Sequence, residues 1–220
     1  MTTTRREPAT TRAVRMPKDQ RRAQLLDAAN DVFTTKGYHA SAMDDIAEAA
    51  GVSKPVLYQH FASKLDLYLA LLDQSCDRLV EIVQDALVST ENNADRVVAT
   101  VGAFYEFVSS ASGEFRFVFE SDLTGDSSVQ KRLWRVNDEI ADSIAAVITE
   151  DTALPPAQSK LLAISLVGIA QVSARYWVSP DSHAIPLEDA KRLVSSLAWR
   201  GIRGVPLTEQ RRDRQDPNHP

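Results

Sequence analysis

Apolar residues recur along this chain at intervals of three and four, the spacing that places side chains on one face of an α-helix. Capping and turn residues interrupt this pattern closely before residue 64 and at wider intervals after it. No segment alternates apolar and polar residues as a half-buried strand does. The pattern therefore predicts an all-α protein in which short helices are followed by long ones.

The first two predicted helices have clear ends. One runs from about Lys18 to Lys36 and ends at Gly37; its apolar face carries Leu25, Ala28, Ala29, Val32 and Phe33. The second follows Ser41, whose hydroxyl is expected to accept from an orphan N–H at the helix start. Gly51 follows its last apolar residue, where a left-handed residue closes a helix.

A short third helix and a long fourth helix come next. Ser53 is expected to cap the third, and Pro55 lies in its first turn, where the missing N–H costs little. Ser63 opens the fourth helix with a Ser-x-x-Asp start, and apolar spacing continues to about Thr90. Two short helices joined at Gly51 make a helix-turn-helix, which lays its second helix in a DNA groove.

The run GYHASAMDDIAEAAGVSKPVLYQHFASKLDLYLALL resembles the DNA-binding domain of the TetR family of repressors over about Gln20 to Leu72. The resemblance implies an all-helical homodimer with a ligand-binding C-terminal domain, and Lys54 to Phe61 as the DNA-reading helix. It implies base contacts from Lys54, Pro55 and Val56, phosphate contacts from Tyr58, His60 and Lys64, and a cap at Ser41 that touches the DNA backbone. The whole set of expected DNA-contacting residues is Ser41, Ser53, Lys54, Pro55, Val56, Tyr58, Gln59, His60 and Lys64.

Pro55 and Val56 depart from the family pattern, because many members have glycine or a small polar residue there. Neither side chain can donate a hydrogen bond, so both suit apolar contact with a thymine methyl group. Gln59 lies with Pro55 roughly opposite the core-facing Leu57 on a helical wheel.

The later helices are predicted over Ala94 to Ser110, through Leu133 to Ile148, from Pro156 to about Val178, and after Pro186 through Ile202. This gives four regions: a basic disordered arm at 1–16, a three-helix helix-turn-helix domain at 17–63, a ligand-binding and dimerisation domain at 64–206, and a disordered tail at 207–220.

The helix from Ala157 to Val178 is apolar nearly all round, so both of its sides need cover. A second copy of the chain is the simplest cover for one side, with the last helix completing a four-helix dimer interface. Ser165 and Gly168 would allow close approach. The alternative is a central helix within one monomer.

Large rings crowd the segment from Phe104 to Trp134, which together suits the wall of a long apolar cavity, although for each ring alone ordinary core is the better interpretation. The expected ligand-contacting residues are Val101, Phe104, Phe107, Phe115, Phe119, Leu123, Trp134, Asn137, Ile140, Gln171 and Arg175. Arg116 is a further polar candidate for the head of a ligand.

Charge is distributed unevenly along the chain. Residues 1–22 carry seven basic and two acidic side chains, whereas residues 67–220 carry fifteen basic and twenty-two acidic ones. The arm is therefore expected to be attracted to DNA and the body to be repelled by it. A solvated disordered tail is an equally good interpretation of the arm.

The remaining features fit a cytoplasmic protein. The N-terminus has no apolar core of a secretory signal, and no uninterrupted apolar stretch of about 18 residues predicts a membrane span. Cys76 lies in an apolar helical run and is predicted to be a core residue rather than a redox sensor.

Four scattered histidines give no metal-ligand spacing, and no nucleophile elbow or phosphate-binding glycine loop occurs, so neither an enzyme nor a cofactor is expected. The C-terminal part also resembles fatty-acid-synthesis regulators of the same family, which implies long-chain acyl-CoA as the effector. Two alternatives stay open: a repressor of a drug-efflux or catabolic gene that senses another apolar molecule, and a helical adaptor that does not bind DNA.

Overall fold

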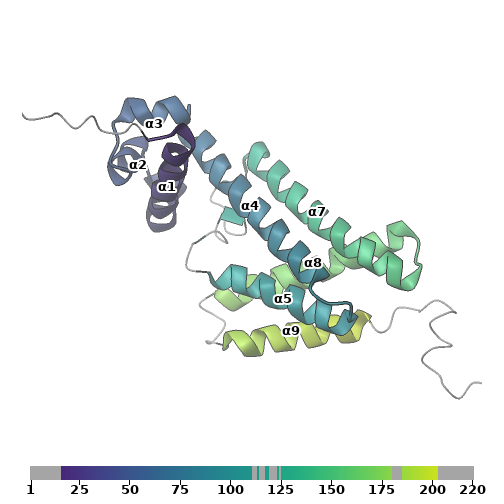
Figure 1. The fold of residues 1–220 in the computed structure, drawn as a ribbon. Coiled ribbons are helices and arrows are strands. Elements are labelled where there is room, and N and C mark those ends of the chain that lie inside the picture. The colour runs from purple at the N-terminus through teal and green to yellow at the C-terminus, as the bar shows by residue number, and fades with distance from the viewer. Residues whose placement is uncertain are drawn as a thin grey trace, which may run out of the picture.

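The computed structural model describes residues 16–110, 113, 117, 118, 123, 125–179 and 185–202. Over these residues the regular elements are helices and none is a strand, which confirms the all-α prediction. Three helices form a unit at one end of the molecule, and a long fourth helix leads from it into a bundle (Figure 1). The helices are α1 (Lys18–Ala40), α2 (Met43–Ala49), α3 (Lys54–His60), α4 (Lys64–Val88), α5 (Asn93–Ser109), α7 (Ser127–Thr152), α8 (Pro156–Val178) and α9 (Leu187–Ile202).

The α1–α3 unit is held by one apolar core to which every helix contributes. Leu25 of α1, Ile46 of α2 and Leu57 of α3 are each 0% exposed. Gly37 has a φ of 77° and interrupts the helical geometry of α1, so the predicted break is present although the helix resumes as far as Ala40. Gly51 has a φ of 64° and closes α2 as predicted.

The helix starts were predicted only in part. Ser63 accepts a hydrogen bond from the Asp66 N–H at 3.0 Å, which confirms the cap of α4. The prediction for Ser41 is wrong, because α2 begins after Ala42 and the Ser41 hydroxyl instead donates to the Tyr38 carbonyl at 2.8 Å. Ser53 precedes α3 but its side chain makes no capping hydrogen bond there. The start of α2 is capped by a residue of its own first turn, since the Ala42 N–H donates to the Asp45 carboxylate at 2.8 Å.

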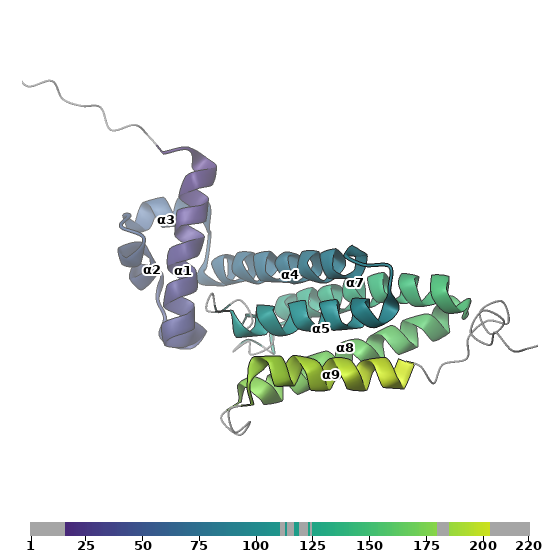
Figure 2. The same ribbon diagram turned by 60° about the horizontal axis from the view of Figure 1, so that its bottom comes forward.

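The bundle is arranged around α4, which packs on both α5 and α7, while α8 lies against α7 and α9 against α5. Figure 2 shows α5 between α4 and α9, with α7 behind it. Tyr105 is buried at the centre and donates its hydroxyl proton to Ser173 Oγ at 2.8 Å. On the surface, Arg132 of α7 pairs with Asp73 of α4 at 2.7 Å.

The described residues cover helix α8 on one side only. By length and composition alone it is apolar enough to cross a membrane. One side packs on α7, but its other side leaves Val172 71% exposed, and Leu197 of the neighbouring α9 is 62% exposed. The exposed apolar residues of the two helices are Leu161, Ile164, Val172, Tyr176, Val178, Leu193 and Leu197.

Candidate DNA-binding surface and ligand cavity

Helix α3 presents one polar face to solvent because its opposite face is anchored in the core. Leu57 is fully buried, and it fixes the rotation of this short helix about its axis. Of the predicted DNA-contacting residues, Ser53, Lys54, Pro55, Tyr58 and Gln59 are exposed, and Val56 and His60 are partly exposed. Lys64 is also partly exposed, so eight of the nine residues are open to solvent at this end of the molecule.

Side chains of α1 support both ends of α3. The Gln24 side-chain amide donates to the Ala50 carbonyl, just before the turn into α3, at 2.9 Å. The Arg22 guanidinium lies 4.3 Å from the centre of the Phe61 ring, at the end of α3. These contacts hold the reading helix on a rigid base.

The Lys54 ammonium is already paired within the helix-turn-helix. Its Nζ lies 2.8 Å from Asp44 Oδ1 of α2. The hydrogen bond to this carboxylate raises the pKa of Lys54. Lys54 therefore remains charged, but it must leave or share Asp44 to contact a base edge.

Lys64 and Ser41 are engaged inside the protein. The Lys64 ammonium donates to the carbonyls of Tyr38 and Ser41, both at 2.7 Å, and lies 4.3 Å from the centre of the Tyr38 ring. Ser41 is buried. These positions favour a structural role in which Lys64 fastens the start of α4 to the α1–α2 connection.

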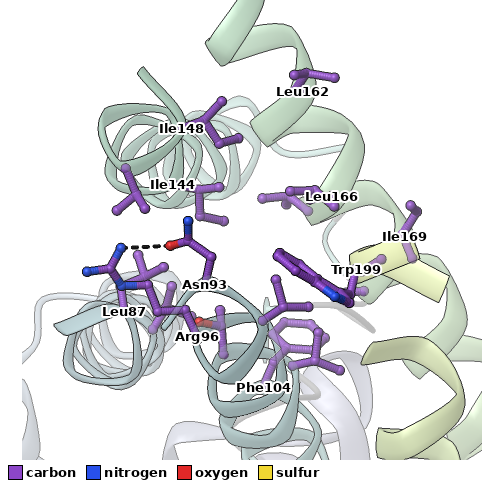
Figure 3. Close-up of a pocket in the computed structure, with 18 of the residues that line it drawn as sticks. Leu87, Asn93, Arg96, Phe104, Ile144, Ile148, Leu162, Leu166, Ile169 and Trp199 are labelled. Atoms are coloured by element: carbon purple, nitrogen blue, oxygen red, sulfur yellow. Dashed lines mark hydrogen bonds between the residues drawn. The ribbon is translucent and has the colours of Figure 1, made fainter. Parts of the chain in front are cut away.

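A partly open cavity of about 480 Å³ lies between α4, α5, α7, α8 and α9. Its wall is mainly aliphatic, with Leu87, Ile144, Ile148, Leu162, Leu166 and Ile169 around it and Phe104 and Trp199 on one side (Figure 3). Such a volume and lining are typical of a site for a small apolar ligand.

One end of this cavity is polar. Asn92, Asn93, Arg96 and Asp151 line it there. Arg96 donates to the Thr90 carbonyl at 2.8 Å and to Asn93 Oδ1 at 2.9 Å, and its guanidinium lies 3.6 Å from the Asp151 carboxylate. Figure 3 shows Arg96 and Asn93 across the cavity from Trp199. The charged pair Arg96 and Asp151 thus lies at one end of the wall, while Thr100 and Gln171 add polar groups elsewhere on it.

The predicted ligand-contacting residues divide into three groups. Val101, Phe104, Ile140 and Gln171 line the cavity. Five others do not line it: Phe107, Leu123, Trp134, Asn137 and Arg175. Phe107 is buried elsewhere, and Leu123 packs against the core. Asn137 accepts a hydrogen bond from Gln171, Arg175 is exposed, and Trp134 is 75% exposed. Phe115 and Phe119 lie outside the described residues, as does Arg116.

Sequence reasoning missed the polar end of the cavity. Arg96 and Thr100 precede Phe104 at intervals of four, so they share its face of α5. That spacing carries the signal in the sequence, whereas large rings alone do not mark the polar residues of a wall. Trp199 of α9 also lines the cavity and carried no such signal.

Neither the Cys76 thiol nor the possible metal ligands among the described residues form a reactive site. Burial raises the pKa of the Cys76 thiol to about 12, as expected of a core cysteine. Among the described residues, no group of three or more His, Cys, Asp or Glu side chains could hold a metal ion.

Comparison with known proteins identifies the family. Residues 25–71 match the sequence profile of "Bacterial regulatory proteins, tetR family". The chain is 43% identical over 197 residues to the HTH-type transcriptional activator FasR of Mycolicibacterium smegmatis, which covers 90% of each protein. This chain belongs to the TetR family. It is therefore a DNA-binding transcriptional regulator and not an enzyme.

Solved structures agree with this fold. A TetR-like transcriptional regulator from Rhodococcus sp. RHA1 is 29% identical, with a TM-score of 0.69 over 87% of this chain and all of that one. FadR of Bacillus subtilis, solved in complex with stearoyl-CoA, is 17% identical with a TM-score of 0.66, over 80% of this chain and 96% of that one. The second likeness shows the shared fold alone.

Proposed function

We propose that this TetR-family regulator binds a palindromic operator as a homodimer and responds to a long-chain acyl-CoA. The observation that carries the proposal is a single helix, α4, that lines an apolar cavity at one end and joins the reading unit at the other. Val83 and Leu87 of α4 contact the cavity, and Lys64 at its start holds the α1–α2 connection.

Dimerisation is supported by the exposed apolar face of α8 and α9. Monomeric proteins seldom leave an apolar surface of this kind uncovered. Gly168 of α8 and Gly201 of α9 have open space where a side chain would stand, so a partner helix could approach their backbones closely. A symmetric pair would cover both copies of this face at once.

Two copies are also what operator recognition requires. One reading helix makes only a few base contacts, each worth about 1–3 kcal/mol. Two such helices about 34–36 Å apart would meet successive major grooves of a palindromic site. In our proposal Lys54, Pro55 and Val56 contact bases, and Tyr58, Gln59 and His60 lie near the backbone.

An acyl chain as the effector is supported by the cavity. Its volume of about 480 Å³ lies within the usual range for small-molecule sites, and most of its wall is aliphatic. The polar end at Arg96 would lie near the head of such an amphiphile. Because the relative FasR is an activator, we infer that this protein also activates its target genes. We infer that these are fatty-acid-synthesis genes and that the protein acts in the cytoplasm.

Coupling between the two sites would run along α4. Val83 lies 19 residues after Lys64, or about 28 Å along a helix. A ligand packed against Val83 and Leu87 would favour one tilt of α4 and so change the spacing of the two reading helices. A coupling of about 1–3 kcal/mol changes operator occupancy severalfold.

The test is a gel shift with promoter fragments, with and without palmitoyl-CoA, at several salt concentrations. We expect specific binding that palmitoyl-CoA alters severalfold and that weakens as salt rises. Lys54→Gln should change operator preference by about tenfold, whereas Tyr58→Phe should weaken all sequences alike. A specific complex that ignores palmitoyl-CoA but responds to an apolar drug would replace the acyl effector with the drug-sensing alternative.

A further inference from the structure

Helix α5 presents a graded set of side chains to the cavity. Arg96, Thr100 and Phe104 all line it and are spaced four residues apart. Successive members therefore lie about 6 Å apart along the helix. These three side chains change from a cation through a hydroxyl to an aromatic ring. A ligand that lies along them therefore meets a hydroxyl deeper in the cavity than the polar end at Arg96.

Thr100 is unusual among these residues. Its hydroxyl oxygen is buried and has no hydrogen-bond partner within the described part of the chain. Burying a hydroxyl without a partner is unfavourable, and valine would fill the same space without that cost. Its nearest neighbours on the cavity wall, Val97 and Val101, are themselves valines. The hydroxyl is thus costly in the free protein. Its oxygen has almost no accessible surface even toward the cavity, so it meets a molecule there only when the side chain turns about its Cα–Cβ bond into another rotamer.

The charge at the polar end narrows the chemistry of that molecule. Arg96 lies 3.6 Å from Asp151, and both side chains are mostly buried. The pair has no net charge, so a free carboxylate placed beside it would meet Asp151 as well as Arg96. A neutral carbonyl has no such conflict, and a threonine hydroxyl can donate to it.

We infer that Thr100 donates a hydrogen bond to the carbonyl oxygen of the bound acyl ester or thioester and so sets how deeply the chain enters the cavity. The inference rests on the proposed function and adds the residue that recognises the acyl link. The hydrocarbon then lies along Phe104, Leu166 and Trp199, and the remainder of the effector extends past Arg96.

The experiment compares two ligands that differ only at the carbonyl: palmitoyl-CoA and its thioether S-hexadecyl-CoA, titrated calorimetrically below their micelle-forming concentrations. Thr100→Val should weaken binding of the thioester about fivefold, equivalent to ~1 kcal/mol, and leave the thioether unchanged. Thr100→Ser, which keeps the hydroxyl, should retain the preference for the thioester.

The ligand-free protein supplies a second readout. Because Thr100→Val removes an unpartnered hydroxyl, it should hold or raise the melting temperature while it weakens thioester binding. Ser159→Ala is the matched control, since Ser159 Oγ is also buried and without a partner in the described residues but does not line the cavity. That control should leave both affinities unchanged.

The outcomes separate the two proposals. If wild-type protein binds neither compound, the acyl effector is wrong and the role of Thr100 falls with it. If wild-type protein binds both and Thr100→Val changes both affinities equally or neither, the acyl effector stands and the hydrogen bond from Thr100 is refuted.

Discussion

The two parts of this molecule differ in how completely they fill their apolar cores. The α1–α3 unit is closed, because Leu25, Ile46 and Leu57 meet with no exposed surface. The bundle leaves a cavity of about 480 Å³ inside it and an apolar face of α8 and α9 outside it. The short helices fill their core together with the start of α4, whose Tyr68 ring packs on Phe33, whereas the long helices surround space that their own side chains do not fill.

This difference fits the proposed division of work. A reading helix must keep its geometry to meet a groove, and a closed core holds it. A sensing unit must exchange contacts with a ligand and a partner, and uncovered apolar surface supplies the free energy for both. The following experiments would break or sharpen this contrast, beginning with the largest expected effect.

Charges placed on the uncovered face should have the greatest consequence. The double change Val172→Asp and Leu197→Asp should convert the proposed dimer to monomer in sedimentation analysis, because it would bury carboxylates at the interface. Operator affinity should fall by roughly 100-fold or more, since each reading helix would bind alone. Val88→Asp, at an 80% exposed position at the end of α4, is the control and should remain dimeric. Persistence of the dimer in the double variant would contradict our assignment of this face.

Equal truncations in the two parts should have unequal costs. Ile46→Ala in the closed core should lower the free energy of unfolding by about 2–5 kcal/mol in urea titrations. Ile144→Ala should cost clearly less, because Ile144 already borders empty space. Equal losses at the two sites would mean that the cavity wall is as tightly packed as the reading unit.

Removing the partner of Lys54 should alter the selectivity of the reading unit. Asp44→Asn frees the ammonium from its ion pair and removes a negative charge near DNA phosphates. We expect affinity for random DNA to rise about two- to fivefold in fluorescence anisotropy, with a smaller gain on the operator. Glu48→Gln removes an exposed acid from the same helix without touching Lys54 and serves as control. If Glu48→Gln raises the affinity for random DNA as much as Asp44→Asn does, the gain comes from the lost negative charge and not from the freed Lys54.

The smallest effect concerns acid stability. The backbone N–H of Ala42, and then Lys36 at 3.1 Å, lower the pKa of Asp45 below its ordinary value of 3.8. A carboxyl with a lowered pKa stabilises the folded state above its ordinary value and loses that contribution as pH falls through the lowered one. Asp45→Ala should therefore be slightly less stable than wild type near neutral pH and converge with it in acid. Urea midpoints from pH 7 down to pH 2 measure this, and a difference that is constant with pH would refute it.

The sequence predicted local features better than contacts between distant residues. The closing glycine at 51 and the cap at Ser63 depend on neighbours in sequence, and both were found. The two carbonyl acceptors of Lys64 lie 26 and 23 residues earlier in the chain, and no local pattern predicted them; its contact with phosphate stays a prediction. The cap expected at Ser41 failed because the chain enters α2 one residue later, at a position that no local pattern distinguishes.

The cavity shows the same limit. Phe104 and Ile140 were predicted from their size and spacing, and they line it. Trp134 has the same attractive chemistry but lies on the outer side of α7, because the packing of α7 against α4 and α8 decides which side faces inward. Counting rings along a sequence cannot settle that rotation.

The buried thiol described above has a practical consequence. Cys76 is the single cysteine of the chain, and its pKa of about 12 keeps it protonated and unreactive at neutral pH. A new cysteine at exposed Gln59 could then carry a spin label with no background from the native side chain. In a dimer, the interval between the two labels would report directly on how far apart the reading helices stand, before and after the effector is added.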